Sequence, residues 1–193
     1  MDTVTPQTPT RPKRADALRN YERLIAAARE AFAEDGTATS LEEIARRAGV
    51  GIGTLYRNFP SRQELLEAVY VEEVESLCRS ADDLAELPPW EALSAWLHRF
   101  VAYMATKQAL AQELLAYFER DSDLFKGCRR AFYDAGEPLM LRAQEAGVVR
   151  TDTDFDEVIQ MVAGITKMPS ASPEQIGRVL DMALDGLRYG AAA

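Results

Sequence analysis

The sequence has few of the side chains on which metal centres and hydrolytic enzymes most often depend. Its 193 residues include one histidine, His98, and two cysteines, Cys78 and Cys128. A single histidine argues against a His-rich metal centre and against a Ser/His catalytic pair, and we interpret His98 as a surface or capped histidine. The cysteines lie 50 residues apart, which excludes a disulfide framework and favours a reducing compartment. We therefore expect no metal, no cofactor and no enzymatic activity.

Long apolar runs are also missing. No run approaches the ~20 residues that a membrane-spanning helix needs, and the N-terminus does not have the charged and apolar regions of a signal peptide. The composition, with 47% hydrophobic and 27% charged residues, is ordinary for a folded protein. We expect a cytoplasmic protein with no membrane partner.

Basic charge is scarce overall but unevenly distributed. The chain has 22 Lys and Arg residues against 31 Asp and Glu residues, for a net charge of −9. Taken alone, this balance argues against a nucleic-acid binder. Residues 1–62, however, carry a net +2 and residues 63–193 carry −11. Such a division suggests two functions on one chain.

The chain shows no alternation of period two, so we expect no β-sheet. Apolar residues instead recur every three or four positions, which is typical of amphipathic helices. The pattern predicts an all-α fold of about nine helices, near residues 16–35, 41–48, 52–59, 61–80, 90–104, 110–118, 124–147, 155–165 and 172–187.

Several boundary signals support these helices. Ser-x-x-Glu or Ser-x-x-Gln sequences predict capping boxes at Ser40–Glu43, Ser61–Glu64 and Ser172–Gln175. Glycines are expected to end three helices, at Gly36, Gly49 and Gly147. Gly136 and Pro138 predict a kink inside the 124–147 helix.

The two short helices at 41–48 and 52–59 have the spacing of a helix-turn-helix. Gly49 and Gly51 give the intervening turn its conformational freedom, and the second helix of such a unit enters the DNA major groove. Leu55 and Phe59 are four residues apart and should face the core. The residues that this turns outward are Gly53, Thr54, Tyr56, Arg57 and Asn58.

These outward residues have the chemistry of DNA contacts. Arg57 can form a bidentate pair with a guanine edge, and the hydroxyl and amide groups can donate to phosphate oxygens. The start of the next helix, at Ser61 and Arg62, offers free N–H groups and a positive dipole to a phosphate.

The first 15 residues contain three prolines and four threonines and have no helical periodicity. They predict a flexible basic arm that ends in Arg11, Lys13 and Arg14. Two interpretations stay open: Lys13 and Arg14 contact DNA along the phosphates or in a minor groove, or the arm is a solvated tail.

The segment Ser40–Val69, SLEEIARRAGVGIGTLYRNFPSRQELLEAV, resembles the DNA-binding head of the TetR/AcrR family of bacterial transcriptional regulators. The preceding AREAFAEDG also fits, and the resemblance covers about residues 16–75. It implies a three-helix head at 16–60, behind the arm at 1–15. It also implies a ligand-binding and dimerisation domain at 61–193, whose first helix, 61–80, links the two domains.

The resemblance also implies site residues. Base and phosphate contacts would fall on Ser40, Ile52, Gly53, Thr54, Tyr56, Arg57, Asn58 and Arg62, with Tyr56 as the phosphate-binding tyrosine. Many members have Ser or Thr where this chain has Gly51, and a polar residue where it has Ile52. Ile52 could contact a thymine methyl group but could not read a hydrogen-bonding group.

For the C-terminal domain, the resemblance implies a small-molecule cavity and a homodimer. Cavity candidates are Trp96, Phe100, Tyr103, Met104, Phe118, Phe125, Phe132 and Met140. The last two helices should pair with their copies, and candidate interface residues are Val162, Gly164, Ile165, Val179, Ala183 and Leu187.

The sequence thus favours a ligand-responsive regulator, most simply a repressor that binds a palindromic operator in double-stranded DNA as a dimer and is released by an unidentified small molecule. One alternative is a helical interaction module without DNA binding, and another is a small all-α enzyme. The acidic cluster formed by Asp152, Asp154, Asp156 and Glu157 lacks the glycine and distal glutamate of an EF-hand. We expect it to cap the helix that follows.

Overall fold

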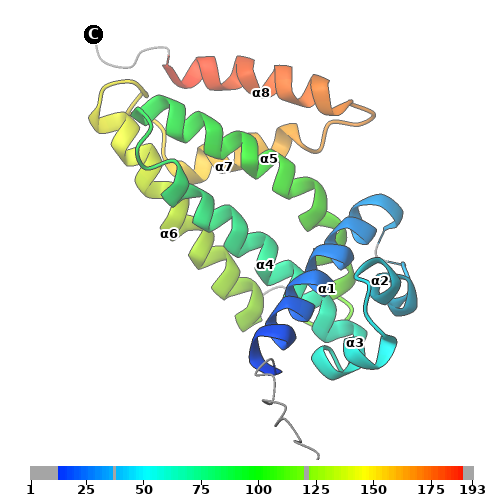
Figure 1. Cartoon of the computed structure of the whole chain (residues 1–193). Coiled ribbons are helices and arrows are strands. Elements are labelled where there is room, and N and C mark those ends of the chain that lie inside the picture. The colour runs from blue at the N-terminus through cyan, green and yellow to red at the C-terminus, as the bar shows by residue number, and fades with distance from the viewer. Residues whose placement is uncertain (1–12, 37, 120–121, 189–193) are drawn as a thin grey trace, which may run out of the picture.

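A computed structural model describes residues 13–36, 38–119 and 122–188, and within these ranges it contains helices and no strands. The helices are α1 (Lys13–Asp35), α2 (Leu41–Arg47), α3 (Ile52–Asn58), α4 (Arg62–Asp83), α5 (Pro89–Leu114), α6 (Asp123–Glu145), α7 (Phe155–Ile165) and α8 (Pro173–Arg188). Figure 1 shows α1–α3 grouped at one end as a head, with α8 at the far end of the body. The expected all-α fold is confirmed.

Two helix boundaries differ from the sequence-based expectation. The helices expected over 90–104 and 110–118 are one continuous helix, α5, because Leu110 and Leu114 continue the buried stripe of Leu93, Leu97 and Phe100. Helix α1 begins at Lys13, three residues before the expected start. Residues 1–12 of the predicted arm lie outside the described residues.

The predicted caps are present in simpler forms. Ser40 and Ser61 each accept a hydrogen bond from the backbone N–H three residues later, and Ser172 accepts one from Gln175. The complete reciprocal capping box lies instead at Asp154 and Glu157, at the start of α7. The acidic cluster therefore does cap the following helix.

The glycines expected to end helices have the predicted backbone. Gly36, Gly49 and Gly147 have φ values of 78°, 63° and 67°, in the region that other residues rarely adopt. Each therefore lets the chain turn sharply where a helix ends.

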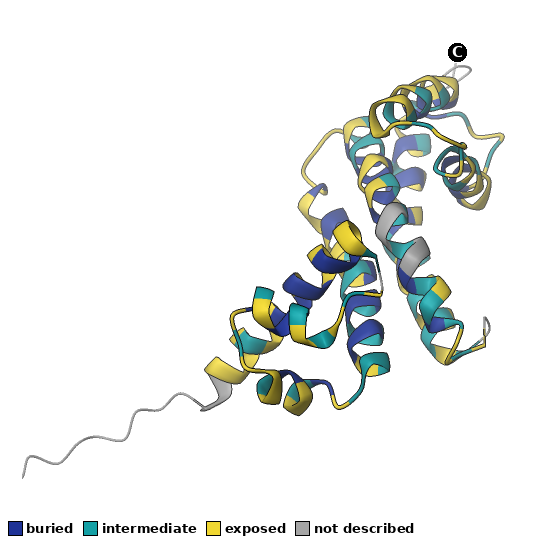
Figure 2. Cartoon of the chain, turned by 90° about the vertical axis from the view of Figure 1, so that its right-hand side faces the viewer, coloured by how far each residue is buried: buried dark blue, intermediate teal, exposed yellow. Residues whose placement is uncertain are grey.

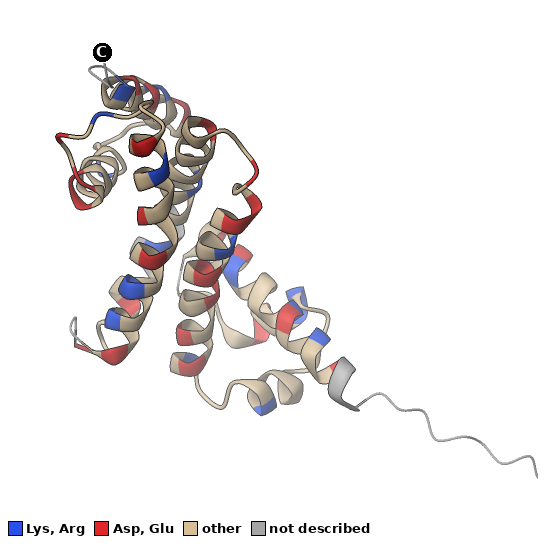
Figure 3. Cartoon of the chain, turned by 90° about the vertical axis from the view of Figure 1, so that its left-hand side faces the viewer, with Lys and Arg blue, Asp and Glu red and all other residues tan. Residues whose placement is uncertain are grey.

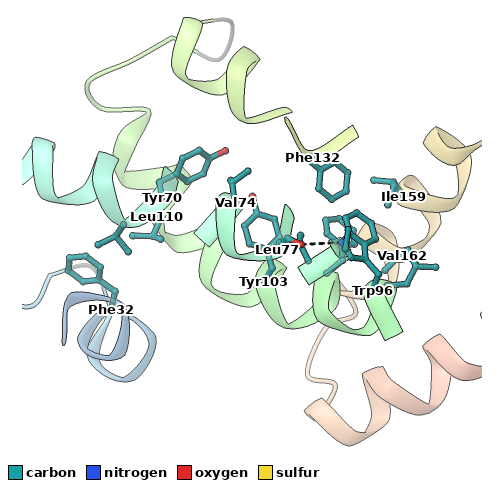
Figure 4. Close-up of a cluster of buried hydrophobic side chains, with 14 of the residues drawn as sticks. Phe32, Tyr70, Val74, Leu77, Trp96, Tyr103, Leu110, Phe132, Ile159 and Val162 are labelled. Carbon is teal, nitrogen blue, oxygen red and sulfur yellow. Dashed lines mark hydrogen bonds between the residues drawn. The ribbon is translucent and has the colours of Figure 1, made fainter. Parts of the chain in front are cut away.

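The core runs without interruption from the head into the body. Helix α4 packs against α1, α5 and α6, and Figure 4 shows Phe32 of α1 beside Leu110 of α5, with Tyr103 further along the same cluster. Figure 2 shows the buried residues following the inner faces of these helices. A shift of α4 or α5 would therefore reach the head through packed side chains.

Gly136 allows α6 to pass close to an aromatic cluster in the body. A Cβ atom at this position would lie 2.4 Å from Trp96 and 2.5 Å from Phe155. Trp96 is fully buried, and its Nε1–H donates to the carbonyl oxygen of Leu77 over 3.2 Å. Helix α6 continues through Gly136 and Pro138, so the role that the structure gives Gly136 is close packing.

In the part of the chain that the structure describes, no helix combines the length and the apolarity that a bilayer crossing requires.

Candidate nucleic-acid interface and ligand cavity

Helix α3 is held by two buried side chains and presents its other faces to solvent. Leu55 is 0% exposed and Phe59, which directly follows the helix, is 3% exposed. Tyr56 and Ile52 are exposed over 46% and 37% of their surfaces. Gly53 and Arg57 are exposed, and Thr54 and Asn58 are partly exposed. The predicted inward and outward faces of α3 are both present.

The turn before α3 is contacted by the side chain of Arg23 from α1. A Cβ atom on Gly49 would lie 2.6 Å from a guanidinium nitrogen of Arg23, and the same nitrogen lies 3.5 Å from the carbonyl oxygen of Gly49. Gly51 caps α3 without a side-chain bond. The turn therefore depends on Gly49 for its φ angle, because the end of the flexible Arg23 side chain could move away from an added Cβ atom.

Some of the predicted DNA contacts already have partners within the head. Asn58 donates its amide N–H to the carbonyl oxygen of Thr54 over 2.8 Å. Arg62 donates to the carbonyl oxygen of Thr39 over 2.7 Å, and its guanidinium group lies 5.8 Å from the ring centroid of Phe32. Arg62 thus ties α4 to α1 and to the segment before α2, a role that the sequence analysis missed. Ser40 is exposed beside it and caps α2.

Part of the basic charge of the head is neutralised internally. The carboxylate of Glu43 accepts from Arg46 at 2.6 Å and from Arg47 at 2.9 Å. Arg47 also pairs with Glu34 at 2.7 Å and with Asp35 at 2.5 Å. These hydrogen bonds lower the pKa of Glu43 to about 2. Arg47 therefore holds α1 against α2, and its charge is largely compensated there.

The predicted contacts at Lys13 and Arg14 fall on the first turn of α1. Their side chains lie outside the described residues, so their role in DNA contact stays a prediction.

The body contains a cavity of about 890 Å³, lined from α4, α5, α6 and α7. Five of the eight cavity candidates line it, namely Phe100, Tyr103, Met104, Phe125 and Phe132. The rings of Phe100 and Phe132 lie 4.9 Å apart, and those of Tyr70 and Phe125 lie 5.4 Å apart, edge to face.

Three predicted cavity residues are not among its lining. Trp96 and Met140 are 0% and 1% exposed and belong to the core. Phe118 is half-buried against the core, near the C-terminal end of α5. For all three, helical periodicity identified a buried face but could not separate core positions from cavity positions.

The polar lining of the cavity was missed by the sequence analysis. It comprises Lys107, Lys126, Arg129, Tyr133, Asp156, Gln160 and Lys167, together with Tyr70 and Cys128. Figure 3 shows Lys and Arg bands in the N-terminal half of α6, whereas Asp and Glu dominate α4. The sequence did contain a signal for this polar lining. On α6, Lys126, Arg129 and Tyr133 recur at three- and four-residue spacing, directly beside the apolar Phe125 and Phe132, so polar and aromatic side chains share neighbouring parts of one helix face.

A smaller hollow of about 560 Å³ lies between α1, α4 and α5. Arg29 of α1 and Glu73 of α4 line it and form an ion pair at 3.7 Å. Tyr103 lines this hollow as well as the larger cavity. Tyr103 is thus shared by the cavity and by the hollow at the junction between head and body.

The predicted dimer residues divide into two groups. Val162 and Leu187 are 0% and 6% exposed and are buried within the subunit, so they have little surface left for a partner. The others remain accessible in whole or in part, namely Gly164, Ile165, Val179 and Ala183. Next to them on α8, Met182 is 66% exposed.

His98 lies on the exposed side of α5, with its Nε2 atom 3.0 Å from a carboxylate oxygen of Asp181 on α8. It is a surface histidine with a partner, as expected. It joins α5 to α8 and is not part of the cavity lining.

Comparison with known proteins gives matches along most of the chain. Residues 24–69 match the family model described as bacterial regulatory proteins, tetR family. Residues 88–189 match the model for the C-terminal domain of SbtR-like transcriptional regulators. The HTH-type transcriptional regulator SAR0097 of Staphylococcus aureus (strain MRSA252) is 34% identical over 83 residues, 42% of this chain. The match spans 44% of that regulator's length.

Solved structures extend the similarity to the body. The TetR transcriptional regulator SCO0520 from Streptomyces coelicolor is 42% identical with a TM-score of 0.75, covering 86% of this chain and 97% of the other. A TetR transcription regulatory protein from Mycobacterium vanbaalenii is 36% identical with a TM-score of 0.74, covering 92% and 99%. FadR from Bacillus subtilis, 19% identical with a TM-score of 0.60 over 88% and 98%, shares the fold.

Proposed function

Because the chain belongs to the TetR family of transcriptional regulators, we propose that it is a cytoplasmic repressor that binds a palindromic operator as a homodimer and is released by a small molecule. Members of this family are DNA-binding regulators and not enzymes. The observation that carries the proposal is the exposed face of α3 over the buried Leu55 and Phe59.

The DNA contacts follow from that face. Arg57 is exposed and can pair with a guanine edge, while Ile52 can contact a thymine methyl group. The hydroxyl groups of Tyr56 and Thr54 can donate to phosphates. Gly53 lets the backbone approach the groove. Ser40, Asn58, Lys13 and Arg14 remain secondary candidates, and we assign Arg62 to positioning the head.

The small surplus of basic charge in the head has a consequence for affinity. Arg46 and Arg47 are paired with carboxylates, so few cations remain for phosphates. Specific affinity should then depend on a few placed contacts and on having two heads. We expect weak non-specific binding and a shallow dependence on salt.

Two recognition helices bind successive major grooves only when a dimer sets them about one DNA turn, ~34–36 Å, apart. The exposed apolar side chains of α8, with Met182 the most exposed, support pairing through this helix. Gly164 on α7 would allow a close approach, because a Cβ atom there would meet nothing within 4 Å in the subunit.

The cavity is the proposed effector site. The structure of FadR from Bacillus subtilis is that of a complex with stearoyl-CoA. The fold that the two proteins share can therefore hold an organic ligand. In this chain Tyr103 lines both the cavity and the hollow beside Arg29 and Glu73. A ligand that displaces Tyr103 would therefore disturb the contact of α1 with α4. Such coupling is typically about 1–3 kcal/mol and acts in both directions.

Fluorescence anisotropy with labelled fragments pooled from the source genome tests the function. The proposal expects micromolar or tighter binding that weakens as salt rises. The leading alternative is a helical interaction module, for which no salt-dependent DNA affinity should be seen. That result would reject the regulator.

A further inference from the structure

The lining of the large cavity in the body combines aromatic side chains with basic side chains. The rings of Phe100, Phe125 and Phe132 provide the apolar surface. The lining also holds the basic side chains of Lys107 and Arg129, together with Lys126 and Lys167, and among its described residues one carboxylate, Asp156. A cavity with both features suits a ligand that has an apolar part and a negative charge.

The carboxylate of Asp156 is held mainly by neutral hydrogen-bond donors of the cavity wall. It accepts hydrogen bonds from the Tyr133 hydroxyl and the Gln160 amide. These bonds, with a smaller contribution from the nearby Arg129, lower the pKa of Asp156. Within the described residues, no ion pair joins Asp156 to a cation of the cavity. Its charge is thus stabilised mainly by neutral donors on the wall between α6 and α7.

Lys107 is the cation held deepest among these groups. It is half-buried on α5, and its ammonium group lies 5.4 Å from the ring centroid of Tyr103. Burial and the neighbouring Arg129 lower the pKa of Lys107. In the part of the chain that the structure describes, no carboxylate forms an ion pair with it. Lys107 is therefore a half-buried ammonium group beside a guanidinium group, with no ion-pair partner among the described residues, whereas buried charges are usually paired.

We propose that the cavity binds an amphipathic organic anion, with its apolar body against Phe100, Phe125 and Phe132 and its acidic group between Lys107 and Arg129. This inference rests on the effector site proposed above and adds the chemical class of the effector. The acidic group supplies the missing counter-charge, and the apolar body covers the aromatic rings. Neutral and cationic molecules of the same shape lack the first of these two contributions.

Calorimetric titration of the full-length protein, without DNA, tests the class. The probes are decanoate and 2-naphthoate, their neutral counterparts decanol and 2-naphthalenemethanol, the cation decylamine, and inorganic phosphate. We expect at least one carboxylate to bind ten times or more tighter than its alcohol, with no binding of decylamine or of phosphate alone. If neither carboxylate binds more tightly than its alcohol, or if decylamine binds as tightly as decanoate, the proposal is overturned.

Two variants test where in the cavity the acidic group of the ligand binds. Lys107→Met and Arg129→Gln should each weaken binding of the carboxylate about tenfold while leaving the affinity for the alcohol unchanged. Arg130→Gln is the matched control, since Arg130 neighbours Arg129 but is 85% exposed and lies 3.6 Å from Asp134. If Lys107→Met does not fold, Arg129→Gln still tests the position of the acidic group, because Arg129 is exposed and its replacement should not prevent folding. Unchanged carboxylate affinity in the folded variants rejects the assignment.

DNA binding, measured separately by anisotropy, distinguishes a wrong effector class from a wrong assignment as a DNA-binding regulator. Normal DNA affinity with no preference for carboxylates rejects the effector class and leaves the regulator standing. Loss of DNA affinity in the unmodified protein rejects the regulator itself.

Discussion

Arg62, the first residue of α4, donates a hydrogen bond to the backbone carbonyl oxygen of Thr39 over 2.7 Å. This bond ties the helix that leads into the body to the segment that precedes α2. Arg62 was expected to contact a phosphate, which stays a prediction, and the structure adds a bond that one of its guanidinium nitrogens makes inside the head. Arg62 therefore helps to hold the head on the body, whereas the exposed side chains of α3 are the ones proposed to face DNA.

Arg62→Ala should reduce the free energy of unfolding by about 1–2 kcal/mol, because a hydrogen bond from a charged donor is lost. Urea denaturation followed by circular dichroism measures this. Arg57→Ala is the control, since Arg57 is exposed and its replacement should change stability by less than about 0.5 kcal/mol. Equal stability of the two variants would contradict the role given to Arg62.

Arg57 and Tyr56, both exposed on α3, should differ in how they affect the preference for one DNA sequence over another. Arg57→Ala should cost about 1–3 kcal/mol of discrimination, because a bidentate base contact is lost. Tyr56→Phe should weaken all duplexes by a similar, smaller factor, since a phosphate contact carries no sequence information. Anisotropy on a selected duplex and on a scrambled duplex separates the two effects. A sequence-dependent loss in Tyr56→Phe would argue against the assignment.

Gly136→Ala should destabilise the protein by about 1–3 kcal/mol, because the added methyl group would overlap Trp96 and Phe155. Gly127→Ala on the same helix is the matched control. Nothing lies within 4 Å of a Cβ atom there, so it should be neutral or stabilising by up to about 1 kcal/mol. Thermal melts of both variants give the comparison, and similar melting temperatures would show that Gly136 is not needed for packing.

Stability should depend on pH through Glu43. Its pKa falls from 4.5 to about 2 in the folded head because Arg46 and Arg47 donate to its carboxylate. A lowered folded pKa means that this contribution is complete above about pH 4.5 and is lost as the pH falls towards 2. Glu43→Gln should therefore destabilise the head at pH 6 and have a much smaller effect near pH 2.

Urea denaturation across this range checks the prediction. Glu42→Gln is the control, because Glu42 is exposed beside Glu43 and, among the described residues, accepts none of these arginine bonds. The same pH profile in both variants would rule out the arginine pairing as the cause.

Met182→Glu on α8 should shift the protein from dimer towards monomer, because it places a charge on the apolar surface proposed to meet the partner. Leu141→Glu introduces the same side chain at an exposed apolar position of another helix, α6, where Leu141 is 51% exposed. It should leave the dimer intact. Sedimentation velocity distinguishes the two outcomes. A wild-type protein that is monomeric at all concentrations would contradict the dimer.

The sequence predicted features that depend on local spacing. Leu55 and Phe59 identified the inner face of α3 because residues four apart share one face of a helix. The helix end at Gly49 and the acidic cap of α7 could be predicted for the same reason, because each depends only on neighbouring residues in the sequence. The close packing of Gly136 was missed because the residues that require it, Trp96 and Phe155, lie far away in the sequence, and the kink at Gly136 and Pro138 stays a prediction.

The cavity shows the same limit. Periodicity marked Trp96 and Phe100 alike as buried, although only Phe100 lines the cavity. The distinction depends on how α5, α6 and α7 pack together. The partners of Arg62 and the gathering of Lys107 with Arg129 also come from tertiary packing, so neither could be predicted from spacing alone.

The most direct test of DNA recognition is selection of bound duplexes from a random library by the purified protein. Two α3 helices in a dimer predict an enriched palindrome whose half-sites lie about one helical turn apart. Arg57→Ala should enrich a less defined sequence. Failure of the unmodified protein to enrich any sequence, at low as well as at moderate salt, would contradict the account.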